Sequence, residues 1–171
     1  MQSDLPDIFF KAVSFRDAAT VKDFLTSNPE LIHVRHRTDA STALHFATAE
    51  NRVENALILL NAGADVDAKD ADGNTPLHYA VWGREDVVTL LLRHGADMSL
   101  KNKDGYTAED FANFSRSQLS QKLLREEPAR RAAEKQKKEE QRDQNLSTKQ
   151  QADHDRNLDR IDQWLHKHKK K

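Results

Sequence analysis

The sequence predicts an all-α fold in which two-helix repeats stack side by side, and three observations support this prediction. One motif recurs with a period of 32 to 33 residues, helix-start and helix-stop signals alternate within each period, and the charge balance changes near residue 124. A fixed period of this length is typical of stacked arrays, in which each unit buries its apolar face against its neighbours.

The period is visible in three separate motifs. Residues 42–47 (TALHFA) return 33 residues later as residues 75–80 (TPLHYA). Residues 59–65 (LLNAGAD) return 32 residues later as 91–97 (LLRHGAD), and residues 72–75 (DGNT) return as 104–107 (DGYT). Because all of these landmarks recur with nearly the same spacing, the chain repeats a structural unit rather than a single motif.

Each unit contains signals for two helices and a turn. Thr75 is a good N-cap, and Pro76 at the first helical position loses only an N–H that would lack an intrahelical partner. The apolar residues among 87–92 predict a second helix, and Gly95 supplies the left-handed residue that ends it. The Asp, Asn and Gly residues of 70–74 favour a tight turn between units.

These motifs resemble the ankyrin-repeat family, whose pattern D-x-x-G-x-T-P-L-H-x-A precedes a second helix and L-L-x-x-G-A-D. Residues 71–103 match this pattern closely, whereas residues 38–70 match it with Ala40 in place of the turn glycine, Ala43 in place of the proline and Asn51 in place of the interhelical glycine. The resemblance implies an ankyrin-repeat solenoid with β-turn tips. Asn tolerates the left-handed conformation better than other non-glycine residues.

Residues 5–124 are expected to form the repeat domain, with degenerate units at both ends that present polar outer faces. In the first unit, Ile8, Phe9, Ala12 and Val13 are expected to bury one helix. In the last unit, the expected closing residues are Leu119, Leu123 and Leu124. The expected units are an N-terminal cap repeat (about 5–37), two full repeats (38–70 and 71–103) and a C-terminal cap repeat (104–124).

The charge balance separates the tail from the array. Residues 1–124 carry 13 basic and 18 acidic side chains, whereas residues 125–171 carry 14 and 10. The tail has too few large apolar residues to build a core. Pro128 is expected to break the chain after the last array helix, residues 125–152 to form a charged helical linker, and residues 153–171 a short amphipathic helix with a basic end.

Four apolar residues of the tail, Leu158, Ile161, Trp164 and Leu165, are candidates for a second partner contact. Leu158, Ile161 and Leu165 have helical spacing, so a helix here carries one apolar stripe. Three interpretations stay open: the helix docks on the array, binds a groove of another protein, or rests on a membrane surface. Docking is favoured over the membrane because the stripe is only about two turns long.

Several function classes have no support in the sequence. There is no cysteine, no nucleophile elbow, no phosphate-binding loop and no zinc-protease motif, so we expect no enzyme, cofactor or small-molecule substrate. The histidine pairs lack a third ligand at informative spacing, and the aspartates of 65–72 lack the spacing of a calcium loop, so we expect no metal.

The resemblance implies binding of another protein through the turn tips and the adjoining face of each first helix. Trp82 and Tyr106 are of special interest because aromatic residues supply much of the energy at interfaces. The alternative for Trp82 is that it fills the gap left by a residue missing between the helices of repeat 71–103. The candidate partner-binding residues of the array are Asp39, Ser41, Glu50, Asp72, Asn74, Trp82, Lys103, Asp104 and Tyr106.

Six other residues are expected to be structural. In the family, the histidine of the T-P-L-H motif typically bonds to the capping threonine and to neighbouring backbone, which implies this role for His45 and His78. The structural set is Thr42, His45, Gly63, Thr75, His78 and Gly95.

The first hypothesis for function is a non-catalytic adaptor that binds a protein partner through the array. The alternative is a regulatory or inhibitory subunit that occludes one target, with the C-terminal helix as a second contact. The acidic array argues against nucleic acid as a partner. We expect a monomer that is intracellular, and cytoplasmic rather than nuclear, because no apolar window or basic leader suggests a membrane span or secretion.

Overall fold

A computed structural model of the chain describes residues 5–15 and 17–168, with the backbone alone for residues 153–155 and 157–168. Within this part of the chain the regular structure is helical, with a single isolated bridge between Arg35 and Thr42. The predicted all-α fold is therefore confirmed. The helices are α1 (Leu5–Phe15), α2 (Ala18–Ser27), the 3₁₀ helix η1 (Pro29–His33), α3 (Ala43–Ala49), α4 (Val53–Asn61), α5 (Pro76–Ala80), α6 (Glu85–Arg93), α7 (Ala108–Ser115) and α8 (Gln118–His168).

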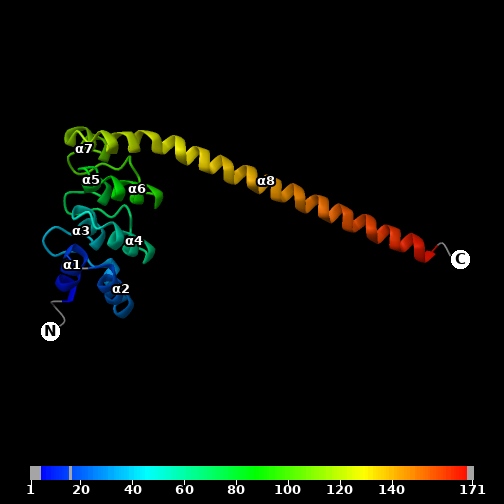
Figure 1. Cartoon of the computed structure of the whole chain (residues 1–171), viewed down its shortest axis with the longest axis horizontal. Helices are drawn as coiled ribbons and strands as arrows, with labels where there is room; N and C mark the ends of the chain where they lie inside the picture. Colours follow the sequence, from blue (N-terminus) through cyan, green and yellow to red (C-terminus); the bar gives the residue numbers. More distant parts are fainter. Residues whose placement is uncertain (1–4, 16, 169–171) are drawn as a thin grey trace. The chain divides into compact units, whose positions relative to one another are not determined.

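The chain divides into two compact units, one that ends at Glu127 and one that begins at Pro128. In the first unit the helices pack in two columns (Figure 1). Helices α1, α3, α5 and α7 contact one another in succession, and α2, α4 and α6 do the same beside them. Each pair α1/α2, α3/α4 and α5/α6 also packs together, which is the stacking that the repeat period predicts.

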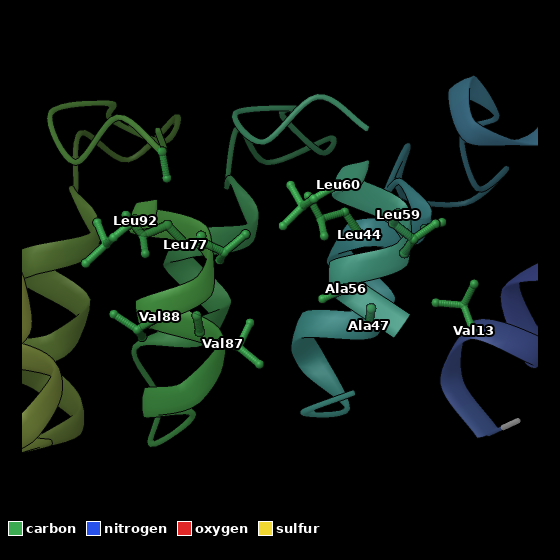
Figure 2. Close-up of a cluster of buried hydrophobic side chains, with 14 of the residues drawn as sticks. Val13, Leu44, Ala47, Ala56, Leu59, Leu60, Leu77, Val87, Val88 and Leu92 are labelled. Atoms are coloured by element: carbon green, nitrogen blue, oxygen red, sulfur yellow. The ribbon is translucent and has the colours of Figure 1, made fainter. Parts of the chain in front are cut away.

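The core follows the stack from one pair of helices to the next. Leu44 of α3, Leu59 of α4 and Leu77 of α5 are completely buried. Figure 2 shows how these side chains lie between the helices, with Val13 on the side of α1 and Val88 on the side of α6. Burial of each such side chain stabilises the fold by about 1.5–3 kcal/mol, so the apolar positions of the repeat hold neighbouring units together.

The N-terminal unit differs from its prediction at two residues. Ile8 is 50% exposed, whereas Phe10, which was not in the predicted set, is 3% exposed. The reason is that Phe10 is the residue that reaches α3, where its ring lies 5.0 Å from the ring of Phe46. Phe9, Ala12 and Val13 are buried as expected.

The last unit also differs in one residue. Leu119 is 50% exposed, so it does not close the stack, although Leu124 is buried. The buried face of α8 runs through Ser120, Leu124 and Glu127, which have helical spacing i, i+4, i+7. Leu119 lies one residue away from this stripe and therefore faces outward.

The prediction that Pro128 breaks the chain was wrong, because α8 contains this proline. A proline inside a helix costs one backbone hydrogen bond. The residues on either side, from Glu126 to Arg130, are otherwise strong helix formers. The predicted domain boundary after residue 124, and the division of the tail at 152, stay predictions.

The residue missing from repeat 71–103 shortens the connection between its two helices. In the repeat before it, the Arg52 N–H donates to the Ala47 carbonyl at 2.7 Å. In repeat 71–103 the Arg84 N–H donates to the Ala80 carbonyl at 3.0 Å, so the same junction is reached one residue sooner. Helix α5 accordingly has 5 residues, against 7 in α3.

Two non-glycine residues adopt the left-handed conformation that the motif requires. Ala40 has φ 55° and Asn51 has φ 52°. They occupy the positions of Gly73 and Gly83 in the next repeat, where φ is 79° and 88°. The substitutions at the two glycine positions thus keep the backbone shape of the motif, at a steric cost for Ala40.

Candidate protein-binding site

Three exposed aspartates form a row at the turn tips. Asp39, Asp72 and Asp104 each lie three residues before the threonine that begins a first helix. The tips are joined by backbone hydrogen bonds: the Ala71 N–H donates to the Asp39 carbonyl at 2.7 Å, and the Lys103 N–H to the Asp72 carbonyl at 2.9 Å. Each tip is therefore fixed relative to the next.

The other candidate residues of the turns and of the α3 end differ in accessibility. Glu50, at the C-terminus of α3, and Lys103 are exposed. Ser41 is 5% exposed, so a residue expected at the surface lies almost entirely below it. Asn74 is half-buried, and its Oδ1 accepts a hydrogen bond from Asn102 Nδ2 at 2.9 Å.

His45 and His78 join successive repeats. His45 Nδ1 accepts from the Thr42 N–H at 3.1 Å, and Nε2 lies 3.1 Å from the Asn74 carbonyl oxygen of the next turn. His78 makes the same contacts with the Thr75 N–H and the Tyr106 carbonyl oxygen. Because Nδ1 accepts, the proton of the neutral ring lies on Nε2, which donates to the carbonyl.

Burial lowers the pKa of both histidines, against the opposing effect of the hydrogen bond to the carbonyl. In the last unit Asp110 takes the place of the histidine, and its Oδ2 accepts from the Thr107 N–H at 2.8 Å and the Thr107 hydroxyl at 2.7 Å. These hydrogen bonds lower the pKa of Asp110. All three groups act as helix caps, and the side chains of the two histidines are buried.

The two structural glycines follow the second helices of their repeats. Gly63 after α4 and Gly95 after α6 both have φ 92°. This is the left-handed conformation that a helix C-terminus favours.

Four aromatic residues, which we call the aromatic cluster, form an exposed apolar surface toward the C-terminal end of the array. Trp82 is 50% exposed, Tyr106 44% and Phe114 59%, and Phe111 is half-buried among them. The ring of Phe111 lies 6.1 Å from Trp82, edge to face, and Phe114 lies 5.4 Å from Tyr106 in the same geometry. Edge-to-face contacts of this kind hold the rings in defined positions.

Sequence reasoning identified Trp82 and Tyr106 but missed Phe111 and Phe114. A signal for Phe114 was present, because Trp82 and Phe114 each lie seven residues after the capping threonine of their unit. The gap left by the missing residue does not bury Trp82, since half of its side chain is exposed.

A small cavity, which we call the Asp39 pocket, lies at the first turn tip. Its volume is about 110 Å³. Residues from the turn, α3 and α5 surround it, and two of them are aromatic. The pocket is lined by Asp39, Ser41, His45, Phe46, Ala49 and Tyr79.

A second cavity, of about 300 Å³, lies beside α1 and shares Phe46 with the Asp39 pocket. Phe10 and Phe15 contribute apolar walls, and Phe15 is 71% exposed. Arg37 on its rim pairs with Asp7 at 2.7 Å. Aromatic side chains thus recur on α1, α3, α5 and α7.

The tail residues of the prediction, Leu158, Ile161, Trp164 and Leu165, belong to α8, but their side chains lie outside the part of the molecule that the structure describes. Among the described residues, no group of three His, Asp or Glu side chains has the geometry to hold a metal ion. None of the described helices is long and apolar enough to cross a membrane.

Comparison with known families decides what this arrangement is. A family model described as ankyrin repeats, in three copies, matches residues 9–102, which is more than half of the chain. The chain belongs to the ankyrin-repeat family. Ankyrin repeats are typical protein-binding modules, so the family membership supports a binding or regulatory role.

Individual ankyrin-repeat relatives share only part of this chain. Protein phosphatase 1 regulatory subunit 12A of Mus musculus is 44% identical over 75 residues, which are 43% of this chain and 7% of that protein. Serine/threonine-protein kinase VIK of Arabidopsis thaliana is 41% identical over 69 residues, 40% of this chain and 16% of the kinase. The Notch protein of Drosophila melanogaster is 41% identical over 64 residues, 37% of this chain and 2% of that protein. The chain therefore spans a small fraction of each of these proteins.

Proposed function

We propose that this ankyrin-repeat chain is a non-catalytic adaptor that binds a protein partner across its turn tips and first helices. The observation that carries the proposal is the aromatic cluster, in which three of four rings are about half exposed or more. Large apolar patches on a soluble surface mark interaction sites, and aromatic residues are enriched among the residues that dominate binding energy.

The surrounding surface supports the same proposal. Asp72, Lys103 and Asp104 are exposed at turn tips that a backbone hydrogen bond joins. Asp104 lies two residues before Tyr106 of the aromatic cluster. Charged groups around an apolar centre are the usual anatomy of an interface. The tail residues Leu158, Ile161, Trp164 and Leu165 are proposed as a second contact, on their spacing in the sequence.

The test uses the full chain and its double variant W82A/F114A as baits in a native lysate. Because both side chains are exposed, we expect the variant to melt within a few degrees of wild type and to lose the proteins that wild type retains. The matched control is L57A, which removes an exposed leucine (39%) from α4, outside the first helices. Retention of the same proteins by W82A/F114A would contradict the proposal.

The alternative function is a regulatory subunit that occludes one target. Similarity to a regulatory subunit of protein phosphatase 1 supports this alternative. A purified protein phosphatase 1 is the direct probe. If the chain is a regulatory subunit, we expect it to form a stoichiometric complex with the phosphatase and to change the phosphatase activity. The variant W82A/F114A is expected to do neither. A further variant, W164A/L165A, tests the tail, since weaker binding to the same target is expected only if the tail is a second contact.

A further inference from the structure

The Asp39 pocket has the shape of a site for one slender side chain. Phe46 of α3 and Tyr79 of α5 supply aromatic walls, and Ala49 leaves the space between them open. A volume of about 110 Å³ corresponds to roughly four water molecules. This space admits the aliphatic stem of one side chain.

Asp39 provides a negative charge at this pocket. Its Oδ1 accepts from the Ser41 N–H at 3.1 Å and lies 3.0 Å from His36 Nδ1. Burial by itself raises the pKa of Asp39, but the hydrogen bonds from Ser41 and His36 outweigh it and lower the pKa. The carboxylate is therefore ionised at neutral pH. Since 52% of the side chain is exposed, a cation of a partner can reach it.

The other charged groups near the pocket leave its sign negative. The Tyr79 hydroxyl donates to Asp70 Oδ2 at 2.7 Å, which places a second carboxylate behind the aromatic wall. Burial lowers the pKa of His45, so its ring is neutral at neutral pH. The Arg35 guanidinium donates to two backbone carbonyls, at 3.0 and 2.6 Å. Its one positive charge is outnumbered by the carboxylates of Asp39 and Asp70.

We infer that the Asp39 pocket binds an arginine side chain of the protein partner, with the guanidinium beside the Asp39 carboxylate and the stem between Phe46 and Tyr79. Arginine fits this combination because its apolar stem packs along aromatic rings and its planar guanidinium pairs with carboxylates. An apolar side chain in the same place would cover the carboxylate and leave it without a cation. The inference rests on the proposed function, because it names the chemistry of the same partner.

The next repeat explains why this pocket is open at Asp39. The residue equivalent to Ala49, seven positions after the capping threonine, is Trp82 in the following repeat. Trp82 lies edge to face against Phe111, the residue equivalent to Tyr79. The substitution Ala49→Trp therefore imitates a side chain that the fold already accepts and is expected to fill the Asp39 pocket.

The experiment selects ligands for the full chain from a random peptide library displayed on phage. The selected peptides are then synthesised with each arginine replaced by citrulline, its neutral isostere. We expect one arginine whose replacement weakens binding by about fivefold, because citrulline keeps the stem and the planar end group but loses the charge that pairs with Asp39. Measured against D39N, the same replacement is expected to change the affinity by less than about twofold, because the charge that it recognises is gone.

Two variants are the controls. D104N removes the equivalent aspartate of the last tip. Although Asp104 belongs to the proposed binding surface and its loss lowers overall affinity, the ratio of arginine-peptide to citrulline-peptide affinity is expected to stay as in wild type. A49W is expected to abolish the effect while its melting temperature stays near that of wild type. The amide side chain introduced by D39N retains an oxygen for the Ser41 N–H, so this variant is also expected to fold.

The outcomes separate this inference from the proposed function. If the selected peptides depend on Trp82 and Phe114 but show no citrulline effect that D39N removes, the arginine site is wrong and the adaptor proposal stands. If binding is unaffected by W82A/F114A as well, both are wrong. A library from which no peptide is retained contradicts both in the same way.

Discussion

Thr48 is a buried polar residue at a position where the next repeat has valine. It is fully buried in α3, and its Oγ1 has no hydrogen-bond partner among the described residues. The equivalent residue, six positions after the capping threonine, is Val81, which is also fully buried. Because an unsatisfied buried hydroxyl costs about 1–3 kcal/mol, Thr48→Val is expected to raise the free energy of unfolding by about 1 kcal/mol.

Urea denaturation of the purified chain measures this change. The reciprocal variant Val81→Thr is expected to lower stability by a similar amount or more, since it buries a new hydroxyl. A neutral or destabilising effect of Thr48→Val would mean that the hydroxyl has a partner in solution.

The two buried histidines predict a pH dependence of stability. Because the pKa of each is lowered in the folded state, the unfolded chain binds more protons below about pH 6.5. The contribution of each is complete above that pH and is lost as the pH falls toward the folded pKa, by up to about 1.4 kcal/mol per pH unit. Urea denaturation between about pH 7.5 and 5.5, a window that brackets the unfolded pKa, measures the slope.

The double variant H45Q/H78Q is the control for this slope. It is expected to be less stable than wild type at neutral pH, because the contacts to the Asn74 and Tyr106 carbonyls are altered, and to show a flatter profile. An unchanged slope in the variant would assign the dependence to other groups.

At the residue scale, the sequence predicted the capping histidines more completely than the binding surface. A helix cap depends on neighbours three residues away, which a motif specifies directly. The aromatic cluster depends on contacts between units, such as that of Trp82 with Phe111. The Asp39 pocket likewise arises from side chains of two successive repeats, so its shape could not be read from either one alone.

At the scale of the structural elements, two glycines of the turn tips, Gly73 and Gly105, differ in how closely the next turn approaches them. A Cβ on Gly73 would lie 3.1 Å from the backbone nitrogen of Lys103 and 3.3 Å from Asn102 Cα, whereas a Cβ on Gly105 would meet nothing within 4 Å. Both glycines have positive φ. Each alanine substitution is therefore expected to cost about 1–2 kcal/mol for the left-handed conformation.

The steric contact adds to this cost at one tip only. We expect the melting temperature of Gly73→Ala to fall clearly below that of Gly105→Ala, because only at Gly73 would the added Cβ be too close to the backbone of the next turn. Differential scanning calorimetry of the two variants makes the comparison. Equal melting temperatures would show that the tips separate easily.

The helices of the repeats followed from local signals, whereas the ends of the array did not. Pro76 and the capping threonines fix where the first helices begin, and these signals act within one turn. At the ends, each residue packs on one neighbour instead of two, so small shifts in helix rotation decide burial. Ile8 and Leu119 are exposed for this reason, although their apolar side chains suggested that they belong to the core.

At the scale of the whole molecule, we expect the helix of the second unit to be locally less stable than the helices of the repeats. The described side chains from residue 132 to 152 are all exposed, and the ion pair of Arg130 with Glu134, at 2.7 Å, is a local i,i+4 contact. A helix held by such pairs alone is marginal in water. We expect its amides to exchange at least about 100-fold faster than those of α3 to α6.

Hydrogen exchange followed by mass spectrometry measures this contrast across the chain. Exchange in the second unit is also expected to rise with salt, because the pairs are screened. Protection of residues 132–152 equal to that of the repeats would contradict the prediction and imply packing by a second chain.

The hydrogen bonds that join the turn tips have a kinetic consequence. Since the Ala71 N–H already holds the Asp39 carbonyl, the row of tips exists before any partner arrives. Association should then be a single step, with an observed rate that rises linearly with partner concentration and without a plateau. The entropy lost on binding should fall mainly on the partner, so that stiffening the partner, rather than the repeats, is the effective way to lengthen the lifetime of the complex.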